Sequence, residues 1–340
     1  MRNIKVLVVD DSKLFRKLLA EGLNAEAGLE VVAEAQDAFA ARDAIVKYRP
    51  DVMTLDIEMP RMDGLVFLKK LLPQYPMPVV MVSALDGKVF DAMQAGAVDF
   101  VNKPVNASPD ELRRFMKQEL AVKVKIASTV KKSKLKLAAE PQSTPHPAIR
   151  AGKRDVIAIG ASTGGTEAIR QVIEEFGTDI PGIVMVQHMP VGFTSMYAQR
   201  LNDVCRVSVK EARTGDAVRP GQVLLAPGDK HMRLVKVGSG YQVECKEEAK
   251  VSGHCPSVDV LFHSVAKTAG NKALGIILTG MGKDGADGLL AMKKAGAITI
   301  GQDEASCIVY GMPKVAFDIG AVDYQMPLTS ISNKVYNLLK

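Results

Sequence analysis

Short apolar runs rich in β-branched residues alternate with amphipathic helical stretches along residues 1–122. This alternation of strand and helix is typical of a doubly wound parallel sheet, with helices on both faces. Five strands are predicted in this first domain, at Lys5–Val9, Leu29–Ala35, Val52–Asp56, Pro78–Ser83 and Asp99–Asn102.

The alternation stops over residues 123–153 and returns after them. Residues 140–147 carry three prolines and no apolar period, so 123–153 is predicted to be a linker. A second α/β domain is predicted over 154–340, again a doubly wound parallel sheet. Functional residues of such sheets gather at the carboxyl ends of the strands. The predicted strands are Val156–Gly160, Gly182–Gln187, Val223–Ala226 and Leu274–Thr279, with weaker candidates at Ile298–Gly301 and near Asp318–Asp323.

The composition agrees with two globular domains in a chain of 340 residues, because 47% are hydrophobic and 24% are charged. No apolar run reaches the roughly 20 residues needed to cross a bilayer, and the first residues lack a signal-peptide pattern. The four cysteines show no C-x-x-C spacing. We therefore expect a cytoplasmic protein with reduced thiols and no membrane insertion.

The net charge of +6 does not indicate nucleic-acid binding, because much of the excess lies in residues 123–136 and 150–154. A basic run of this kind is typical of a solvated linker. The second domain is also almost twice as long as a helix-turn-helix domain and lacks its interleaved basic residues. We expect no nucleic-acid partner.

Acidic residues stand at the ends of the predicted strands of the first domain. Asp10 and Asp11 close the first strand and Asp56 closes the third. Three neighbouring carboxylates repel one another, so the cluster is stable only with a cation or with raised pKa values, and its hard oxygen ligands suit Mg²⁺. Ser83 at the end of the fourth strand and Lys103 after the fifth offer a hydroxyl and a positive charge, which suit a phosphoryl group.

The motifs Val8–Ser12, Leu55–Gly64 and Val101–Pro104 resemble those of response-regulator receiver domains over residues 1–122. The resemblance implies a flavodoxin-like fold, with Asp56 as phosphoacceptor and Asp10, Asp11 and Asp56 as the Mg²⁺ ligands. It implies that Ser83 is the switch hydroxyl, that Lys103 contacts the phosphoryl group, and that Phe100 stands at the switch aromatic position. A plain core role also fits Phe100.

In the second domain, the stretch G-A-S-T-G-G at 160–165 fits two interpretations. Its glycines could cradle a phosphate, or its turn could present Ser162 as a nucleophile. The stretch is not G-x-G-x-x-G, and no Walker lysine follows it, which disfavours nucleotide binding. A serine nucleophile needs a histidine base oriented by a carboxylate.

His188 is the favoured base, because it ends the strand that follows the serine. His146 falls in the linker, His231 and His263 suit solvent or core roles, and His254 beside Cys255 has no second pair for a metal. Asp284 follows another strand and is the candidate carboxylate, with Asp287 as a rival. Backbone N–H groups near Met281 could stabilise an oxyanion.

The motifs around Ser162, His188 and Asp284, together with Pro256–Asp259 and Tyr310–Pro313, resemble the chemotaxis protein-glutamate methylesterase family from residue 154 to the end. The resemblance implies a Rossmann-like catalytic domain with the triad Ser162, His188 and Asp284. It also implies the Met281 N–H in the oxyanion hole, a hydrogen-bonding role for Thr163, and no cofactor for the esterase reaction.

The family likeness implies that the chain removes methyl groups from glutamate γ-methyl esters of chemoreceptors, releasing methanol, and also deamidates receptor glutamines. A chemotaxis histidine kinase would be the phosphodonor. We expect the unphosphorylated receiver to cover the serine, so that deleting residues 1–150 raises activity, and we expect a monomer. The alternatives are a receiver-regulated nucleotide-binding protein and a non-enzymatic adaptor, which would leave the serine, histidine and aspartate unexplained.

Overall fold

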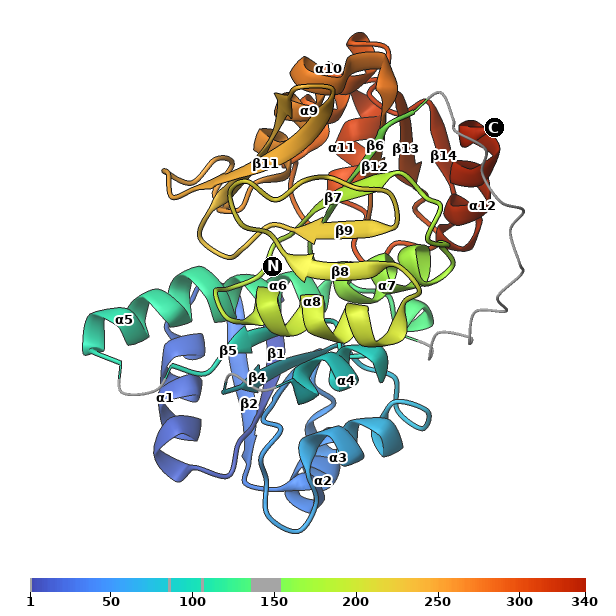
Figure 1. The fold of residues 1–340 in the computed structure, drawn as a ribbon. Helices are drawn as coiled ribbons and strands as arrows, with labels where there is room; N and C mark the ends of the chain where they lie inside the picture. The colour runs from blue at the N-terminus through green and yellow to red at the C-terminus, as the bar shows by residue number, and fades with distance from the viewer. Residues whose placement is uncertain (1, 85–86, 105–106, 136–153) are drawn as a thin grey trace. The chain divides into compact units, whose positions relative to one another are not determined.

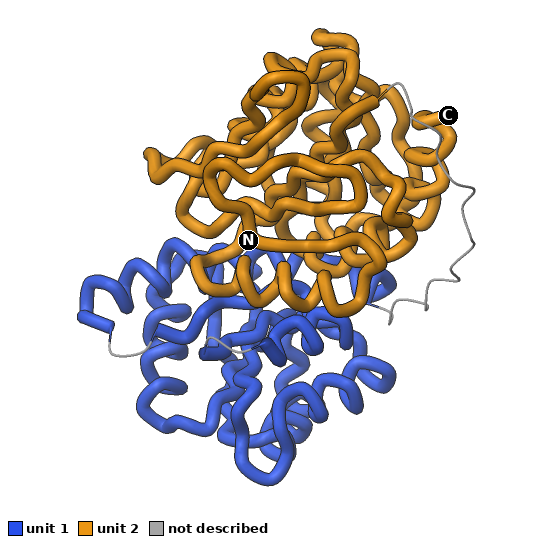
Figure 2. The backbone as a smooth tube through the Cα atoms, viewed as in Figure 1, with its two compact units in different colours: residues 1–139 blue, residues 140–340 orange. Residues whose placement is uncertain are grey.

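The computed structural model describes residues 2–84, 87–104, 107–135 and 154–340. The chain divides into two compact units, 1–139 and 140–340, coloured separately in Figure 2. No helix within the described ranges is long and apolar enough to cross a membrane.

The first unit, at the blue end of the colour scale in Figure 1, contains a five-stranded parallel sheet in the order β2-β1-β3-β4-β5. This order confirms the predicted doubly wound sheet, and it is the flavodoxin-like one. Residues Val6 to Val9 of β1 are almost fully buried, as expected for a strand with helices on both faces. The strands are β1 Ile4–Val9, β2 Leu29–Ala35, β3 Val52–Leu55, β4 Val79–Ser83 and β5 Asp99–Asn102, and the helices are α1 Lys13–Asn24, α2 Ala38–Tyr48, α3 Gly64–Leu71, α4 Lys88–Gln94, α5 Pro109–Arg114, η1 Phe115–Leu120, α6 Ala121–Ser128 and η2 Lys132–Lys134.

The structure differs from the sequence prediction at the start of the linker, because residues 121–128 form α6. Val124 and Ala127 of this helix are buried, three residues apart on its inner face. Lys123 donates a hydrogen bond of 2.7 Å to the carboxylate of Asp99 in β5. The basic residues concealed this narrow apolar stripe in the sequence. Residues 132–134 of the predicted linker form the short helix η2, and residues 136–153, with His146, lie outside the described residues.

The second unit is built on a seven-stranded parallel sheet in the order β14-β13-β12-β6-β7-β9-β8. The chain begins in the middle at β6, continues on one side through β7, and returns to the other side at β12, so the strand order reverses between β6 and β12. This confirms a Rossmann-like sheet with a switch point at its centre. The strands are β6 Val156–Ala161, β7 Gly182–Gln187, β8 Ser208–Glu211, β9 Gln222–Leu225, β12 Ala273–Ile277, β13 Ile298–Gln302 and β14 Tyr324–Met326.

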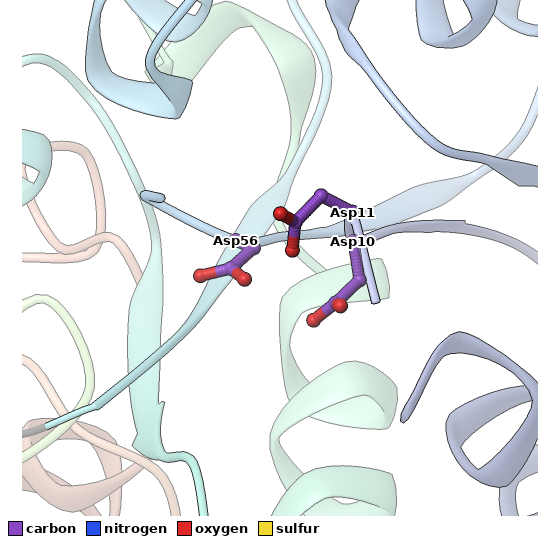
Figure 3. Close-up of side chains that lie close together, drawn as sticks. All are labelled: Asp10, Asp11 and Asp56. Carbon is purple, nitrogen blue, oxygen red and sulfur yellow. The ribbon is translucent and has the colours of Figure 1, made fainter. Parts of the chain in front are cut away.

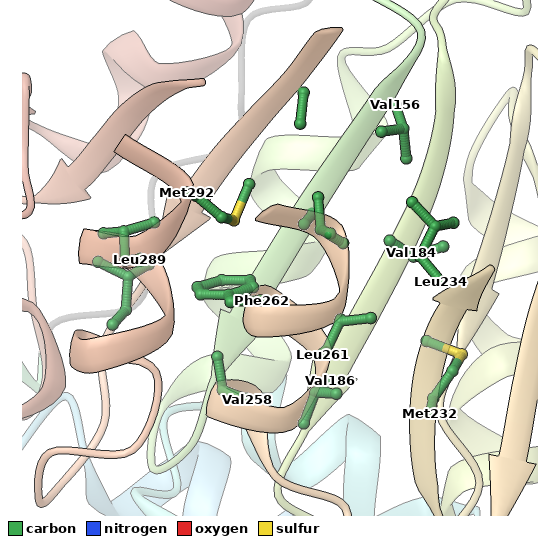
Figure 4. Close-up of a cluster of buried hydrophobic side chains, with 14 of the residues drawn as sticks. Val156, Val184, Val186, Met232, Leu234, Val258, Leu261, Phe262, Leu289 and Met292 are labelled. Carbon is green, nitrogen blue, oxygen red and sulfur yellow. The ribbon is translucent and has the colours of Figure 1, made fainter. Parts of the chain in front are cut away.

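Helices and a β-hairpin enclose this sheet. Side chains of α9 pack between the strands, the hairpin and α10, as Leu261 and Phe262 show in Figure 4. On α12 the hydroxyl of Ser332 donates to the carbonyl oxygen of Val172 on α7, which joins those two helices. The elements are α7 Gly165–Glu174, α8 Phe193–Val204, β10 His231–Val237, β11 Gly240–Lys246, α9 Val258–Ala269, η3 Gly270–Lys272, α10 Ala286–Lys294, α11 Met312–Asp318 and α12 Leu328–Leu339.

The weak strand prediction near Asp318–Asp323 is wrong. Helix α11 ends at Asp318, and the chain turns through Gly320, whose φ of +75° suits glycine. Ala321 is buried in the core between the helix and the strand. The edge strand itself is β14, which pairs in parallel with β13. The sequence prediction also missed β8 and the hairpin β10–β11.

Candidate functional site

Ser162 lies directly after β6, in the tight turn that leads into α7. Its N–H donates to the carbonyl oxygen of Thr279 at 3.0 Å, and its own carbonyl accepts from the N–H of Gly165 at 2.7 Å. Gly164 has a φ of +76°, a left-handed conformation that glycine adopts without strain. The backbone at Ser162 is therefore fixed from both sides, while its side chain stays partly accessible.

The glycines of this turn lie close to protein side chains. A Cβ added at Gly165 would lie 2.2 Å from Oε1 of Gln187, and one at Gly164 would lie 2.7 Å from Cβ of Ile308. Gly280, from the loop after β12, approaches closely enough that its Cβ would lie 2.7 Å from Cβ of Ser162. Close packing around the serine, rather than a phosphate cradle, explains why glycines occupy these positions.

His188 follows β7, whose residue Gln187 is paired in register with Ala161 on β6. The N–H of His188 donates to the carbonyl oxygen of Ala161 at 3.2 Å. The side-chain amide of Gln187 donates to the carbonyl oxygens of Ser162 and His188, at 2.9 and 3.2 Å. Ser162 and His188 are thus held side by side on neighbouring strand ends, as the sequence analysis expected.

The imidazole of His188 meets the carboxylate of Asp284, with 2.7 Å between Nε2 and Oδ2. The rival Asp287 is exposed on the first turn of α10. The other ring nitrogen of His188, Nδ1, is buried and has no hydrogen-bond partner among the described residues. Within that same part of the chain, Ser162 and His188 form no side-chain hydrogen bond with each other.

Asp284 is 1% exposed and accepts four hydrogen bonds. Oδ2 accepts from His188 and from the N–H of Val258 at 2.8 Å, and Oδ1 accepts from the Ser257 hydroxyl at 2.7 Å and the N–H of Asp259 at 3.1 Å. Burial raises the pKa of Asp284, but these bonds, that from His188 foremost, outweigh it and hold the pKa well below its usual range. The carboxylate is therefore ionised, and Nε2 of His188 carries the proton between them.

Asp259 is a second buried carboxyl beside Asp284, and it has fewer donors. Its Oδ1 accepts from the N–H of Gly288 at 2.8 Å. Burial raises its pKa to about 6, and the charge of Asp284 adds to this effect in spite of the Gly288 bond. Two neighbouring carboxyl groups are thus pushed apart in pKa, as happens in many catalytic sites.

His254 stacks on the catalytic histidine candidate, which the sequence analysis did not foresee. The two imidazole rings are nearly parallel, with centroids 3.7 Å apart and an interplanar angle of 8°. His231 is fully buried, and His263 is exposed on α9. The only signal for His254 in the sequence is its place just before the Pro256–Asp259 motif.

Met281 lies in the turn after β12 and is 46% exposed. Its N–H makes no hydrogen bond within the described residues, whereas Gly280 on its amino side donates to the carbonyl oxygen of Val309 at 3.0 Å. Met281 directly follows Gly280, which packs closely against Ser162 as described above. Thr163 is buried, and its carbonyl oxygen accepts from the hydroxyl of Thr279.

The first unit holds the acidic cluster shown in Figure 3. Carboxylate oxygens of Asp10, Asp11 and Asp56 all lie within 4.8 Å of one another, with Asp11 exposed. The ammonium of Lys103 donates to Asp10 and to Asp56, each at 2.8 Å. Hard carboxylate oxygens at this spacing form a donor set that suits Mg²⁺.

Burial and mutual charge set the pKa values of this cluster. Burial raises the pKa of Asp10 to about 6, and Asp56 contributes to the rise against the opposing effect of Lys103. Burial lowers the pKa of Lys103, but its hydrogen bonds to the two carboxylates outweigh this, so the pKa is raised. Lys103 is therefore a permanent positive charge at the cluster.

Ser83 and Phe100 lie where the sequence analysis placed them, at the end of β4 and within β5. Ser83 is 2% exposed, and its carbonyl oxygen accepts from the N–H of Lys103 at 2.7 Å. Phe100 is buried, with its ring edge against Phe90 at a centroid distance of 6.0 Å. The ammonium of Lys123 lies 5.2 Å from the centre of the Phe100 ring, so α6 contacts the strand that precedes Lys103.

Comparison with known proteins identifies relatives of both units. The family "CheB methylesterase" matches residues 157–335, and the family "Response regulator receiver domain" matches residues 6–117. A protein-glutamate methylesterase/protein-glutamine glutaminase 2 from Syntrophomonas wolfei is 58% identical over 339 residues, covering 100% of this chain and 98% of the relative. A protein-glutamate methylesterase/protein-glutamine glutaminase from Salmonella typhimurium is 48% identical over 339 residues, covering 98% and 97%. The crystal structure of the Thermotoga maritima CheB methylesterase catalytic domain is 36% identical, with a TM-score of 0.53, covering 54% of this chain and 98% of that one.

Proposed function

The chain belongs to the CheB methylesterase family and carries a response regulator receiver domain, and from this we propose a catalytic mechanism and a set of residues for it. The chain is a protein-glutamate methylesterase and protein-glutamine glutaminase, activated by phosphorylation, that acts in chemotaxis. It hydrolyses glutamate γ-methyl esters of chemoreceptors to the acid and methanol, and glutamines to the acid and ammonia. Both reactions are acyl transfers, so one nucleophile serves both.

In the proposed mechanism Ser162 Oγ attacks the γ-carbonyl carbon. Its proton moves to Nδ1 of His188, because Nε2 already carries a proton and donates it to Asp284. The tetrahedral intermediate then expels the leaving group, which takes that proton and departs as methanol or ammonia. Water then gives a proton to the same Nδ1 and attacks the acyl carbon. The second tetrahedral intermediate expels Ser162 Oγ, which takes this proton back from Nδ1, and the glutamate side chain is released.

The Met281 N–H stabilises the negative charge on the carbonyl oxygen during both attacks. It has no acceptor among the described residues, and it follows Gly280, which packs against Ser162. One well-placed donor of this kind is worth about 3–4 kcal/mol in the transition state. The partly accessible serine suits a substrate that is itself a protein side chain.

The single observation that supports this mechanism best is the state of His188. One ring nitrogen is held at 2.7 Å by an ionised carboxylate, and the other is buried, without a partner in the described chain, on the strand next to Ser162. A buried histidine with only a structural role would have hydrogen-bond partners for both ring nitrogens. This one keeps a lone pair available for a proton.

In the receiver domain we propose Asp56 as the phosphoacceptor, with Asp10, Asp11 and Asp56 holding Mg²⁺. The ion, when bound, neutralises charge on the phosphoryl oxygens. Lys103 already bridges Asp10 and Asp56, which supports a contact from its ammonium to the new phosphoryl group.

We also propose that Ser83 hydrogen-bonds to that phosphoryl group and that Phe100 is the switch aromatic. A buried hydroxyl at the end of β4 and a buried ring in β5 support these two roles. The chemotaxis kinase supplies the phosphoryl group, and the receptor is the substrate. We propose that the enzyme acts as a monomer in the cytoplasm, where a receptor's methylated helices would lie.

The decisive experiment measures methanol release from membranes that carry methyl-labelled chemoreceptors, with the full chain, Mg²⁺ and acetyl phosphate. We expect Ser162→Ala to lower kcat by about 10³-fold or more, as in other serine hydrolases. Asp56→Asn should retain the unstimulated rate and lose the response to acetyl phosphate. A Ser162→Ala enzyme as active as the wild type would refute the proposed nucleophile.

A further inference from the structure

Ser257 is a fully buried serine just before α9, and its hydroxyl is committed to Asp284. The hydroxyl donates to Oδ1 of Asp284 at 2.7 Å and accepts from the N–H of Val260 at 3.4 Å. A serine hydroxyl has a single hydrogen. Because Val260 is a donor, that hydrogen is given to the carboxylate.

The backbone of Ser257 is itself anchored by a second buried residue. Its N–H donates to Nδ1 of His231 at 3.2 Å, and Nε2 of His231 donates to the carbonyl oxygen of Ala249 at 3.0 Å. His231 is fully buried, and both of its ring nitrogens are used, one as acceptor and one as donor. The serine is therefore held firmly relative to the segment that contains Ala249.

The position of Ser257 decides how the carboxylate of Asp284 is oriented. Oδ1 has two donors, the short bond from Ser257 and the 3.1 Å bond from the N–H of Asp259. Without the hydroxyl, Oδ1 keeps only the longer bond from Asp259, and the 2.8 Å bond from the Val258 N–H to Oδ2 is the one strong backbone contact left to resist rotation of the carboxylate about its own axis. Rotation moves Oδ2 away from Nε2 of His188, and Nδ1 then turns away from the serine nucleophile.

We propose that Ser257 is a positioning residue of the catalytic site, which acts through Asp284 to hold His188 in line with Ser162. The chain of contacts runs from His231 to Ser257, then to Asp284 and His188. This inference rests on the proposed triad and adds a fourth residue to it. Ser257 itself touches neither the substrate nor the reacting atoms.

The test compares Ser257→Ala with Ser332→Ala in the full chain, using methanol release from methyl-labelled receptor membranes. Ser332 is equally buried and donates a single hydrogen bond of 3.0 Å, to the carbonyl oxygen of Val172. We expect Ser257→Ala to lower kcat by about 10- to 100-fold with an unchanged KM, the range for one hydrogen bond to a charged group. Ser332→Ala should stay within about twofold of the wild type.

Two further variants separate positioning from folding. Ser257→Gly keeps a residue that helix N-caps accept, so it should melt near the wild-type temperature and still lose kcat. In an Asp284→Ala background, Ser257→Ala should lower the residual rate no further, because its route to His188 is already gone.

Full activity of Ser257→Ala and Ser257→Gly would overturn the proposal. An equal further loss in the Asp284→Ala background would also overturn it. These results can be told apart from a refutation of the proposed triad itself, for which the Ser162→Ala enzyme would have to be active.

Discussion

Replacement of Asp259 by asparagine should make the stability of the catalytic unit less dependent on pH. Asp259 lies in the first turn of α9, is 6% exposed, and accepts a hydrogen bond from the N–H of Gly288. Burial, with the nearby charge of Asp284, raises its pKa from 3.8 to about 6. Asparagine has nearly the same shape and stays neutral.

The direction of the pH dependence follows from the pH at which Asp259 loses its proton in the unfolded and in the folded chain. The unfolded chain releases the Asp259 proton near pH 3.8, whereas the folded chain retains it up to about pH 6. Rising pH therefore favours the unfolded state across this window: the stabilisation is fully present below about pH 4 and is lost as pH passes through about 6. A shift of roughly two pKa units corresponds to about 3 kcal/mol in total, of which about 2 kcal/mol falls between pH ~4.5 and ~7.5.

The assay is guanidinium unfolding of a 154–340 fragment, followed by circular dichroism at several pH values. The fragment corresponds to the Thermotoga maritima catalytic domain that crystallised alone. We expect the difference in unfolding free energy between Asp259→Asn and the wild type to move in favour of the variant by about 2 kcal/mol over that range. Costs of the substitution that do not depend on pH cancel in this comparison.

Asp287→Asn is the matched control, because it removes one negative charge at an exposed position close by. The difference in unfolding free energy between Asp287→Asn and the wild type should vary little with pH. If the difference in unfolding free energy between Asp259→Asn and the wild type is also independent of pH, then ionisation of Asp259 does not destabilise the folded protein. That result would refute the prediction.

Two other predictions concern the geometry of the nucleophile and the base. Gly280→Ala should lower kcat by about 100-fold, because the new Cβ would lie 2.4 Å from Sδ of Met312 and 2.7 Å from Cβ of Ser162, so it would push the serine out of place. The control is Gly240→Ala, where only a carbonyl oxygen lies 4.0 Å from the new Cβ. Equal rates for the two variants would contradict this prediction. His254→Ala should lower kcat by about 3- to 10-fold, because the ring stacked on His188 is lost. His254→Phe should keep most of the rate, since it keeps an aromatic ring at this position. A His254→Phe variant as slow as His254→Ala would count against a role for the stacking.

The buried strands of both sheets could be predicted from the sequence because each is a short apolar run that ends at a polar or small residue. Strand β8 was missed because only Val209 of its four residues is buried, and two of the others, Lys210 and Glu211, are charged. The hairpin β10–β11 was missed for a related reason, since its tip is exposed and few residues of its two strands are buried, namely His231, Met232, Leu234 and Val243. Edge strands that cover little core leave a weak hydrophobic pattern.

Some residues of the candidate site could likewise be predicted from the sequence, and others could not. Ser162, His188 and Asp284 could be proposed because each lies within five residues of the end of a predicted strand, and neighbouring strands of one sheet end at the same edge. Ser257 and His254 precede a helix instead, far along the chain from the strands they serve. Ser257 carried a helix N-cap signal, but no sequence pattern indicates which carboxylate such a serine meets after the helix has packed.

The electrostatics of the catalytic unit come from α9 more than from the sheet. The sheet brings His188 and Asp284 to one edge, but a buried carboxyl without donors would take up a proton and lose its hold on the imidazole. The N-cap Ser257 and the first residues of α9 prevent this by giving Asp284 one hydroxyl and two backbone N–H groups in addition to the His188 bond, while Asp259 in the first turn accepts from Gly288. The unequal number of hydrogen-bond donors decides which of the two carboxyl groups keeps its charge. A change in the packing of α9 should therefore disturb the orientation of His188, the proposed base, more than the position of Ser162, the proposed nucleophile.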